Sequence, residues 1–149
     1  MRKLTMAVLA AGVAAAAQAE VWYVPGWNRT TETNGLAYTS CTNVFKNAKC
    51  AFWGWDGDRG WSTSAANADV AAKRLADEIA ATNAVFRSKL VLVGHSLGGR
   101  VVARTLAELS RRDLKVEQGI MLAPAIPMND ADVVKMGLGC VRPAIVVVN

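Results

Sequence analysis

Residues 90–99 read Leu90-Val91-Leu92-Val93-Gly94-His95-Ser96-Leu97-Gly98-Gly99. The first four are apolar without alternation, which is typical of a strand covered on both faces. Glycines then surround Ser96, and only such small neighbours let a strand turn sharply into a closely packed helix. The stretch therefore predicts a strand, a tight turn that presents Ser96, and a helix.

The first clear helix is predicted from about residue 62 to about residue 82, where Ser62 or Ser64 can cap its amino end. Its face toward the sheet is expected to hold Val70, Leu75 and Ile79. Charges four residues apart are expected to pair on its outer face, Lys73 with Asp77 and Arg74 with Glu78.

The second clear helix follows Gly99. Its apolar residues recur at helical spacing at Val102, Leu106 and Leu109, with Arg104 and Glu108 facing outward. Weaker helices are expected over residues 32–47 and 130–136.

Five short apolar runs have the length of strands: residues 21–25, 51–55, 90–93, 119–122 and 144–148. Because they alternate with helices, the sequence predicts an α/β fold with a parallel five-stranded sheet and helices on both faces. Functional groups of such open sheets gather at the carboxyl ends of the strands, where Ser96 is expected to lie. We expect one domain over residues 20–149.

The first 19 residues have the layout of a secretory signal peptide. Arg2 and Lys3 precede an apolar run over residues 4–17, which ends in Ala17-Gln18-Ala19. The alternative is a membrane anchor, but that run is shorter than the roughly 20 residues a spanning helix needs. We therefore expect a secreted or periplasmic protein with no membrane span after the leader is removed.

The mature chain is only mildly basic. Loss of Arg2 and Lys3 lowers the formal net charge from +5 to +3, and the other basic residues are scattered along helices. This pattern disfavours a nucleic-acid partner. Either Cys41 and Cys50 form a disulfide, which leaves Cys140 unpaired, or all three cysteines are small buried hydrophobes. The spacing does not decide between these two interpretations.

Residues 94–99 resemble the nucleophile elbow of the lipases and esterases of the α/β-hydrolase family. The resemblance implies that Ser96 is the acylated residue and that the N–H of Leu97 is one oxyanion-hole donor. Val24-Pro25-Gly26-Trp27 resembles the His-Gly loop of that family with Pro25 in place of histidine, which makes the N–H of Trp27 the second donor. A plain turn at Pro25 and Gly26 is the alternative.

The resemblance also implies a catalytic histidine after the last strand and an acid after the sixth or seventh strand of the full family fold. The one histidine of this chain, His95, adjoins Ser96 and is expected to be a turn residue, because neighbours on a sharp turn point apart. Asp130 and Asp132 are expected to be a helix cap and a first-turn acid. We expect the acid beyond Asn149 and the chain to be carboxyl-terminally incomplete.

Tryptophans gather after the second predicted strand. Trp53 is expected in the core, whereas Trp27, Trp55 and Trp61 are candidates to border a pocket. Asp56 and Asp58 lack the further ligands of a calcium loop, so we expect a turn, with neither metal nor cofactor.

Two functions follow from these features. The first is a secreted serine hydrolase that cleaves a small-molecule or lipid ester by acyl transfer through Ser96, with little activity because the base is absent. The second is a non-catalytic binding protein that keeps the fold and the pocket.

Overall fold

The computed structural model describes residues 19–29, 35–139, 141 and 146–148. The predicted leader lies outside the described residues except for Ala19, and so does Cys140. In chain order the elements are β1 (Glu20–Val24), α2 (Leu36–Val44), β2 (Lys49–Phe52), α3 (Trp61–Ala80), α4 (Ala84–Arg87), β3 (Leu90–His95), α5 (Leu97–Arg111), β4 (Gln118–Leu122), a 3-10 turn (Met128–Asp130), α6 (Ala131–Leu138) and β5 (Val146–Val148).

The strands lie in the order β2-β1-β3-β4-β5, and every neighbouring pair is parallel. The predicted α/β fold with a parallel sheet is thus confirmed. Within the described residues, β1 to β4 form the body of the sheet, and β5 adds three residues that pair with residues 120–122. Of the strand predicted over residues 144–148, the structure describes residues 146–148, which form β5.

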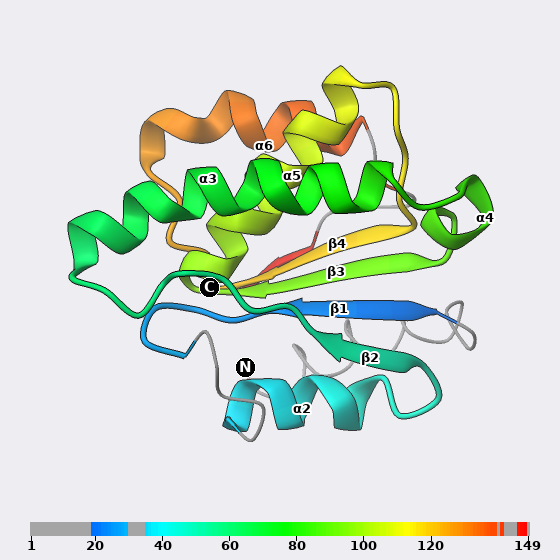
Figure 1. Ribbon diagram of the computed structural model, residues 1–149, viewed down its shortest axis with the longest axis horizontal. Helices are drawn as coiled ribbons and strands as arrows, with labels where there is room; N and C mark the ends of the chain where they lie inside the picture. The colour runs from blue at the N-terminus through cyan, green and yellow to red at the C-terminus, as the bar shows by residue number, and fades with distance from the viewer. Residues whose placement is uncertain (1–18, 30–34, 140, 142–145, 149) are drawn as a thin grey trace.

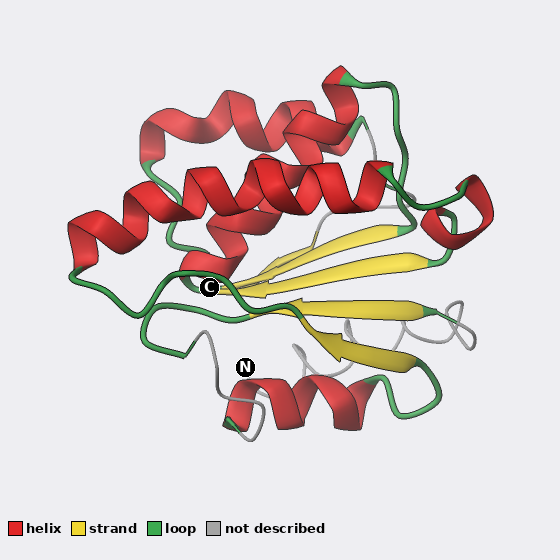
Figure 2. Ribbon diagram, in the orientation of Figure 1, coloured by secondary structure: helices red, strands yellow, loops and turns green. Residues whose placement is uncertain are grey.

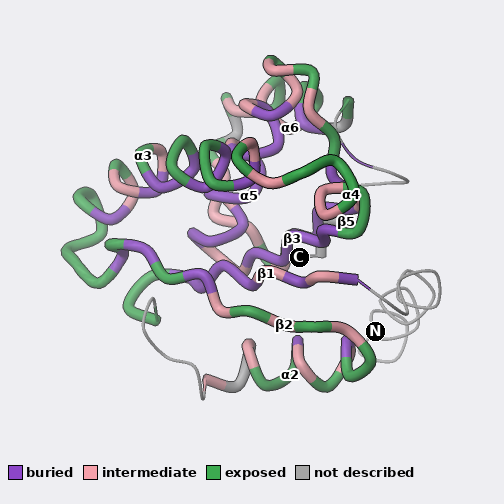
Figure 3. Tube along the Cα trace, turned by 45° about the vertical axis from the view of Figure 1, so that its right-hand side comes forward, coloured by how far each residue is buried: buried purple, intermediate pink, exposed green. Residues whose placement is uncertain are grey.

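Helices lie on both sides of the sheet. Figure 1 shows α2 on one side and α3, α5 and α6 on the other, and Figure 2 shows the strands as the layer between them. Successive side chains of β3 alternate between the two layers: Leu90 and Leu92 pack under α3 and α5, whereas Val91 and Val93 pack toward α2. Because β3 is covered on both faces, its four apolar residues are buried, as Figure 3 shows.

The helix α3 confirms part of its predicted pattern. Leu75 and Ile79 are fully buried, and the predicted ion pairs form at 3.7 Å (Lys73 with Asp77) and 3.5 Å (Arg74 with Glu78). The placement of Val70 toward the sheet is wrong, since it is 71% exposed. The buried face carries small residues instead, namely Ser64, Ala68, Ala71, Ala72 and Ala76.

The predicted cap of α3 is also wrong. Gly60 occupies the N-cap position, and no side chain caps the helix there. Ser64 lies one turn inside the helix, fully buried, and its hydroxyl donates to the carbonyl of Gly57 (2.9 Å) and accepts from the N–H of Arg59 (3.2 Å). Ser64 therefore anchors the loop before α3.

The cysteines within the described residues are free thiols. Cys41 is buried in α2, and burial raises the pKa of its thiol to about 12. Cys50 lies half-buried in β2. Of the two alternatives, a small buried hydrophobe describes Cys41, and the Cys41–Cys50 disulfide is not formed in this structure.

Candidate functional site

Ser96 lies between the end of β3 and the start of α5, as the sequence predicts. Its backbone has φ 54° and ψ −120°, a conformation that a residue with a side chain rarely adopts and that costs on the order of 1–3 kcal/mol. The side chain is half-buried, and its hydroxyl has no hydrogen-bond partner among the described residues. A serine with strained backbone on a sharp strand-to-helix turn is typical of a nucleophile elbow.

The glycines permit this turn because of close backbone contacts. A β-carbon on Gly94 would lie 2.3 Å from the carbonyl oxygen of Gly98, and one on Gly98 would lie 2.1 Å from that of Val24. Real β-carbons do not approach so closely. The strand, the helix and the end of β1 can meet around Ser96 only without these side chains.

The end of β4 and the loop after it bind the backbone of Ser96 through both its N–H and its carbonyl. The N–H of Ser96 donates to the carbonyl of Leu122 (3.0 Å), and the carbonyl of Ser96 accepts from the N–H of Ala125 (2.9 Å). Ala123, between these residues, itself has a positive φ of 43°. The sequence does not predict these two hydrogen bonds, because contacts between neighbouring strands leave no local sequence pattern.

Ser96 lies at a topological switch point of the sheet, where the connections of two neighbouring strands leave on opposite sides. The chain leaves β1 toward α2 on one side of the sheet and leaves β3 toward α5 on the other, so the two loops diverge between β1 and β3 (Figure 1). Open parallel sheets bind ligands in the crevice at this point. Ser96 lies at this point, at the carboxyl end of β3.

The loop of residues 25–27 lies against Ser96. A β-carbon on Gly26 would be 3.0 Å from the Cβ of Ser96, so the two residues are in contact. Within the described part of the chain, the backbone N–H groups of Trp27 and Leu97 donate no hydrogen bond. The N–H of Leu97 belongs to the first turn of α5, where such groups lack helical partners and favour negative charge.

His95 lies beside the same loop. Its Nδ1 would be 3.4 Å from a β-carbon on Gly26, and burial lowers the pKa of its ring below the ordinary value of 6.5. Burial thus favours the neutral form of the ring. No hydrogen bond joins it to Ser96 within the residues that the structure describes, in keeping with its expected role as a turn residue.

The tryptophans separate into two groups. Trp53 is buried as expected, with its Nε1 donating to Glu78 (2.7 Å) and Arg74 above its ring (4.4 Å). Trp55 is only 5% exposed and donates from Nε1 to the carbonyl of Pro25 (2.8 Å). It therefore packs beneath the loop of residues 25–27 and does not border an open pocket. Trp27 and Trp61 keep exposed ring surface at the carboxyl edge of the sheet.

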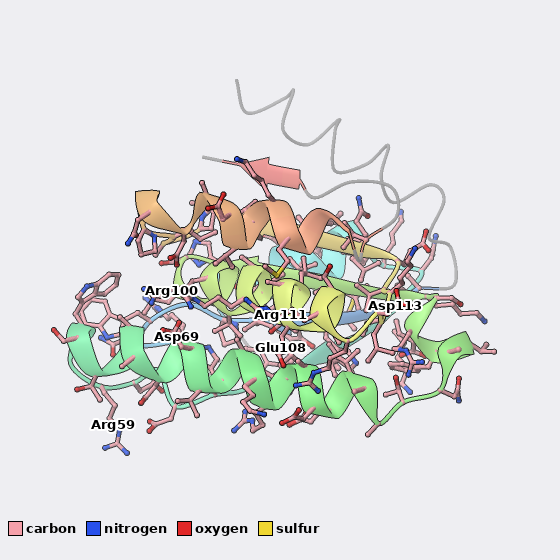
Figure 4. All side chains as sticks on the ribbon, turned by 90° about the horizontal axis from the view of Figure 1, so that it is seen from above. Arg59, Asp69, Arg100, Glu108, Arg111 and Asp113 are labelled. Carbon is pink, nitrogen blue, oxygen red and sulfur yellow. The ribbon has the colours of Figure 1, made fainter. Side chains whose placement is uncertain are left out.

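The acids after β4 do not face Ser96 as free carboxylates. Asp130 occupies the N-cap position of α6, as predicted, but its side chain makes no cap hydrogen bond and pairs with Arg104 instead (2.5 Å). Arg104 also pairs with Asp69 of α3 (2.9 Å), so it does not simply face outward. Figure 4 shows Asp69 turned toward Arg100 of α5, the residue with which it forms two hydrogen bonds of 3.1 Å.

The remaining acids lie at the surface. Asp132 is a first-turn acid of α6, as expected, with its side chain 93% exposed. Asp56 pairs with Arg59 (3.0 Å) and accepts from Asn67 (3.2 Å), which fits a turn. Among the residues that can be described, no group of three potential metal ligands occurs, and no helix is long and apolar enough to cross a membrane.

A family model described as "Protein of unknown function (DUF726)" matches residues 56–145, which is more than half of the chain. The chain belongs to the DUF726 family. The DUF726 match begins before α3 and includes β3, the turn at Ser96, α5, β4 and α6, whereas β1 and the loop of residues 25–27 precede it. No curated protein matches the sequence.

Proposed function

We propose that this DUF726 protein is an exported serine hydrolase of the α/β-hydrolase type that cleaves carboxylic esters by acyl transfer through Ser96. The export rests on the leader pattern of residues 1–19. The hydroxyl of Ser96 adds to the ester carbonyl, the ester C–O bond breaks, and the alcohol leaves with the proton of that hydroxyl. Water then cleaves the acyl–serine bond, which releases the carboxylic acid and restores the hydroxyl.

The observation that carries the proposal is the strained backbone of Ser96 at the switch point. A φ of 54° at a non-glycine residue costs stability, and the fold secures it with one hydrogen bond to β4, one from the loop after β4, and glycine contacts that admit no side chain. Strain that is secured on every side is typical of functional residues. A structural turn at this place would be served better by glycine.

The surroundings of Ser96 suit an oxyanion. The N–H groups of Trp27 and Leu97 belong to the two segments that contact Ser96, and the first turn of α5 adds its favourable dipole. Donors arranged in advance around a developing negative charge are among the largest contributions to acyl transfer. We assign these two N–H groups to the oxyanion hole.

A second candidate function is the binding of an ester-like ligand without turnover. It is favoured by the lack of a base: His95 is the one histidine in the sequence, and it makes no hydrogen bond to Ser96 in the described structure. Removal of the base from a triad disables the serine almost as fully as removal of the whole triad, by about a million-fold in subtilisin.

Covalent labelling tests the proposal. Purified protein is incubated with a fluorophosphonate probe, which reacts with an activated serine, and the labelled peptide is identified by mass spectrometry. We expect slow labelling of Ser96 that is absent from Ser96→Ala and from urea-unfolded protein. Ser62→Ala, which removes an exposed hydroxyl of α3, is the matched control and should label like the unaltered protein.

Two results would count against catalysis. If the folded protein labels no more than Ser96→Ala, the serine is not activated and the binding function is preferred. If Ser62→Ala and Ser96→Ala lose label equally, the reaction is unspecific. A urea unfolding curve of each variant shows that the comparison is made between folded proteins.

A further inference from the structure

Two tryptophan side chains, Trp27 and Trp61, lie together at the surface. They are 39% and 50% exposed, and their ring centroids are 5.5 Å apart with the ring planes at 82°. We call this pair the aromatic corner. Among the large hydrophobic residues exposed in the described structure, only these two are aromatic. Such exposed apolar surface marks sites of interaction.

The aromatic corner is held in place by the backbone. The Nε1 of Trp27 donates to the carbonyl of Arg59 (2.7 Å), and the N–H of Asn28 donates to the carbonyl of Gly57 (3.2 Å). The loop that supplies both carbonyls is in turn anchored by the buried hydroxyl of Ser64. The ring of Trp27 is thus fixed before any ligand arrives, which lowers the entropy lost on binding.

The aromatic corner adjoins the candidate nucleophile. Trp27 follows Gly26 directly, and Gly26 contacts the Cβ of Ser96. The loops that carry the two tryptophans leave the carboxyl ends of β1 and β2, which lie side by side in Figure 1. The backbone of Trp27 is thus one residue from the contact with Ser96, and the aromatic corner and Ser96 lie at the same carboxyl edge of the sheet.

We propose that the aromatic corner binds an aromatic ring in the acyl part of the ester substrate, an assignment that rests on the proposed hydrolase function. The two indole planes are nearly at right angles, so a flat ring placed in the angle between them can stack on one indole and direct its edge at the other. A long alkyl chain gains less, because the open corner leaves much of its length in water. The substrate class is thus an arylcarboxylic ester.

Equilibrium binding tests this assignment independently of turnover. Ser96→Ala protein is titrated with methyl benzoate and with methyl cyclohexanecarboxylate, which has the same ring size without π electrons, and Kd is measured by ligand-observed NMR. We expect the benzoate to bind about fivefold more tightly. Adding Trp61→Leu should abolish this preference, whereas adding Trp61→Phe should retain most of it.

The control is Val70→Ala, which removes an exposed apolar side chain from the same helix outside the aromatic corner. It should leave both Kd values unchanged. Equal Kd values for the two esters, or a preference that survives Trp61→Leu in folded protein, would overturn the assignment.

The two proposals can fail separately. A benzoate preference that depends on Trp61, in a protein whose Ser96 takes no fluorophosphonate, would retain the aromatic corner and reject the hydrolase. Labelling of Ser96 with equal binding of the two esters would retain the hydrolase and reject the aromatic acyl group.

Discussion

A β-carbon on Gly98 would stand 2.1 Å from the carbonyl oxygen of Val24, so α5 begins in direct contact with the end of β1. This contact joins the helix that follows Ser96 to the strand that precedes the loop of residues 25–27. The spacing between the two N–H groups assigned to the oxyanion hole therefore depends on the absence of one side chain.

The substitution Gly98→Ala is expected to destabilise the protein, because the new methyl group must push α5 away from rigid backbone at Val24 and Pro25. The free energy of unfolding should fall by about 1–3 kcal/mol. Urea unfolding followed by circular dichroism measures it. Gly60→Ala, whose β-carbon meets nothing within 4 Å, should change the free energy by less than about 1 kcal/mol. Equal losses in the two variants would contradict the contact.

Replacement of Ser96 by glycine should stabilise the protein relative to Ser96→Ala. Glycine adopts a φ of 54° without strain, whereas alanine keeps the strain and loses only the hydroxyl. The expected difference is about 1 kcal/mol after the larger entropy of an unfolded glycine is subtracted. Thermal unfolding of both variants measures it, and a Ser96→Gly protein less stable than Ser96→Ala would show that the turn is unstrained.

The carboxylate of Asp69 is expected to stabilise the packing of α3 on α5. It binds Arg104 and Arg100, and the side chain of Arg100 is 15% exposed. The substitution Asp69→Asn therefore removes one negative partner from two partly buried guanidinium groups. We expect a loss of about 1–2 kcal/mol in the free energy of unfolding, less than for a fully buried pair because Asp69 is 40% exposed. Asp132→Asn removes a surface pair with Lys135 and should cost under about 0.5 kcal/mol.

His95 should make the stability depend on pH in a window that begins at its ordinary pKa of 6.5. In the folded protein, burial lowers the pKa of the His95 ring below that value. The unfolded chain then takes up a proton first as the pH falls, so the free energy of unfolding decreases below pH 6.5. Urea unfolding at roughly pH 7.5 and roughly pH 5.5 measures the decrease. In His95→Asn it should be smaller.

The acids of the surface pairs act in a lower window. The hydrogen bonds of Arg112 lower the pKa of Asp77 and that of Glu108, so their stabilising effect is complete above their ordinary values and is lost at more acidic pH. A pH dependence between 7.5 and 5.5 that is unchanged in His95→Asn would therefore contradict the assignment to His95.

The two described cysteines should differ in reactivity. Cys41 is 5% exposed with a pKa raised to about 12, so it stays a protonated thiol inside the core. Cys50 is half-buried in the edge strand β2. Iodoacetamide at about pH 8 should alkylate Cys50 first, and Cys41 only on unfolding. Mass spectrometry of the native protein measures this, and a mass lower by two hydrogens would indicate a disulfide instead.

Local sequence patterns predict several elements of the fold. The unbroken apolar run at the start of residues 90–99 predicts a strand covered on both faces, and β3 is such a strand. Val70 was misplaced because hydrophobicity alone does not show which face of a helix packs. The face of α3 that meets α5 is chosen by small alanines that permit close approach, and Val70 lies opposite to them.

The sequence by itself determined the strand, the turn and the helix around Ser96, because glycine spacing and apolar periodicity act within about twenty residues of chain. Tertiary structure alone decided that Gly26 touches Ser96, that the end of β4 and the loop after it bind the backbone of Ser96, and that the carboxylate of Asp130 pairs with Arg104 rather than capping α6. Those contacts join residues tens of positions apart in the chain. Their partners are set by strand order and by the side of the sheet on which each helix packs.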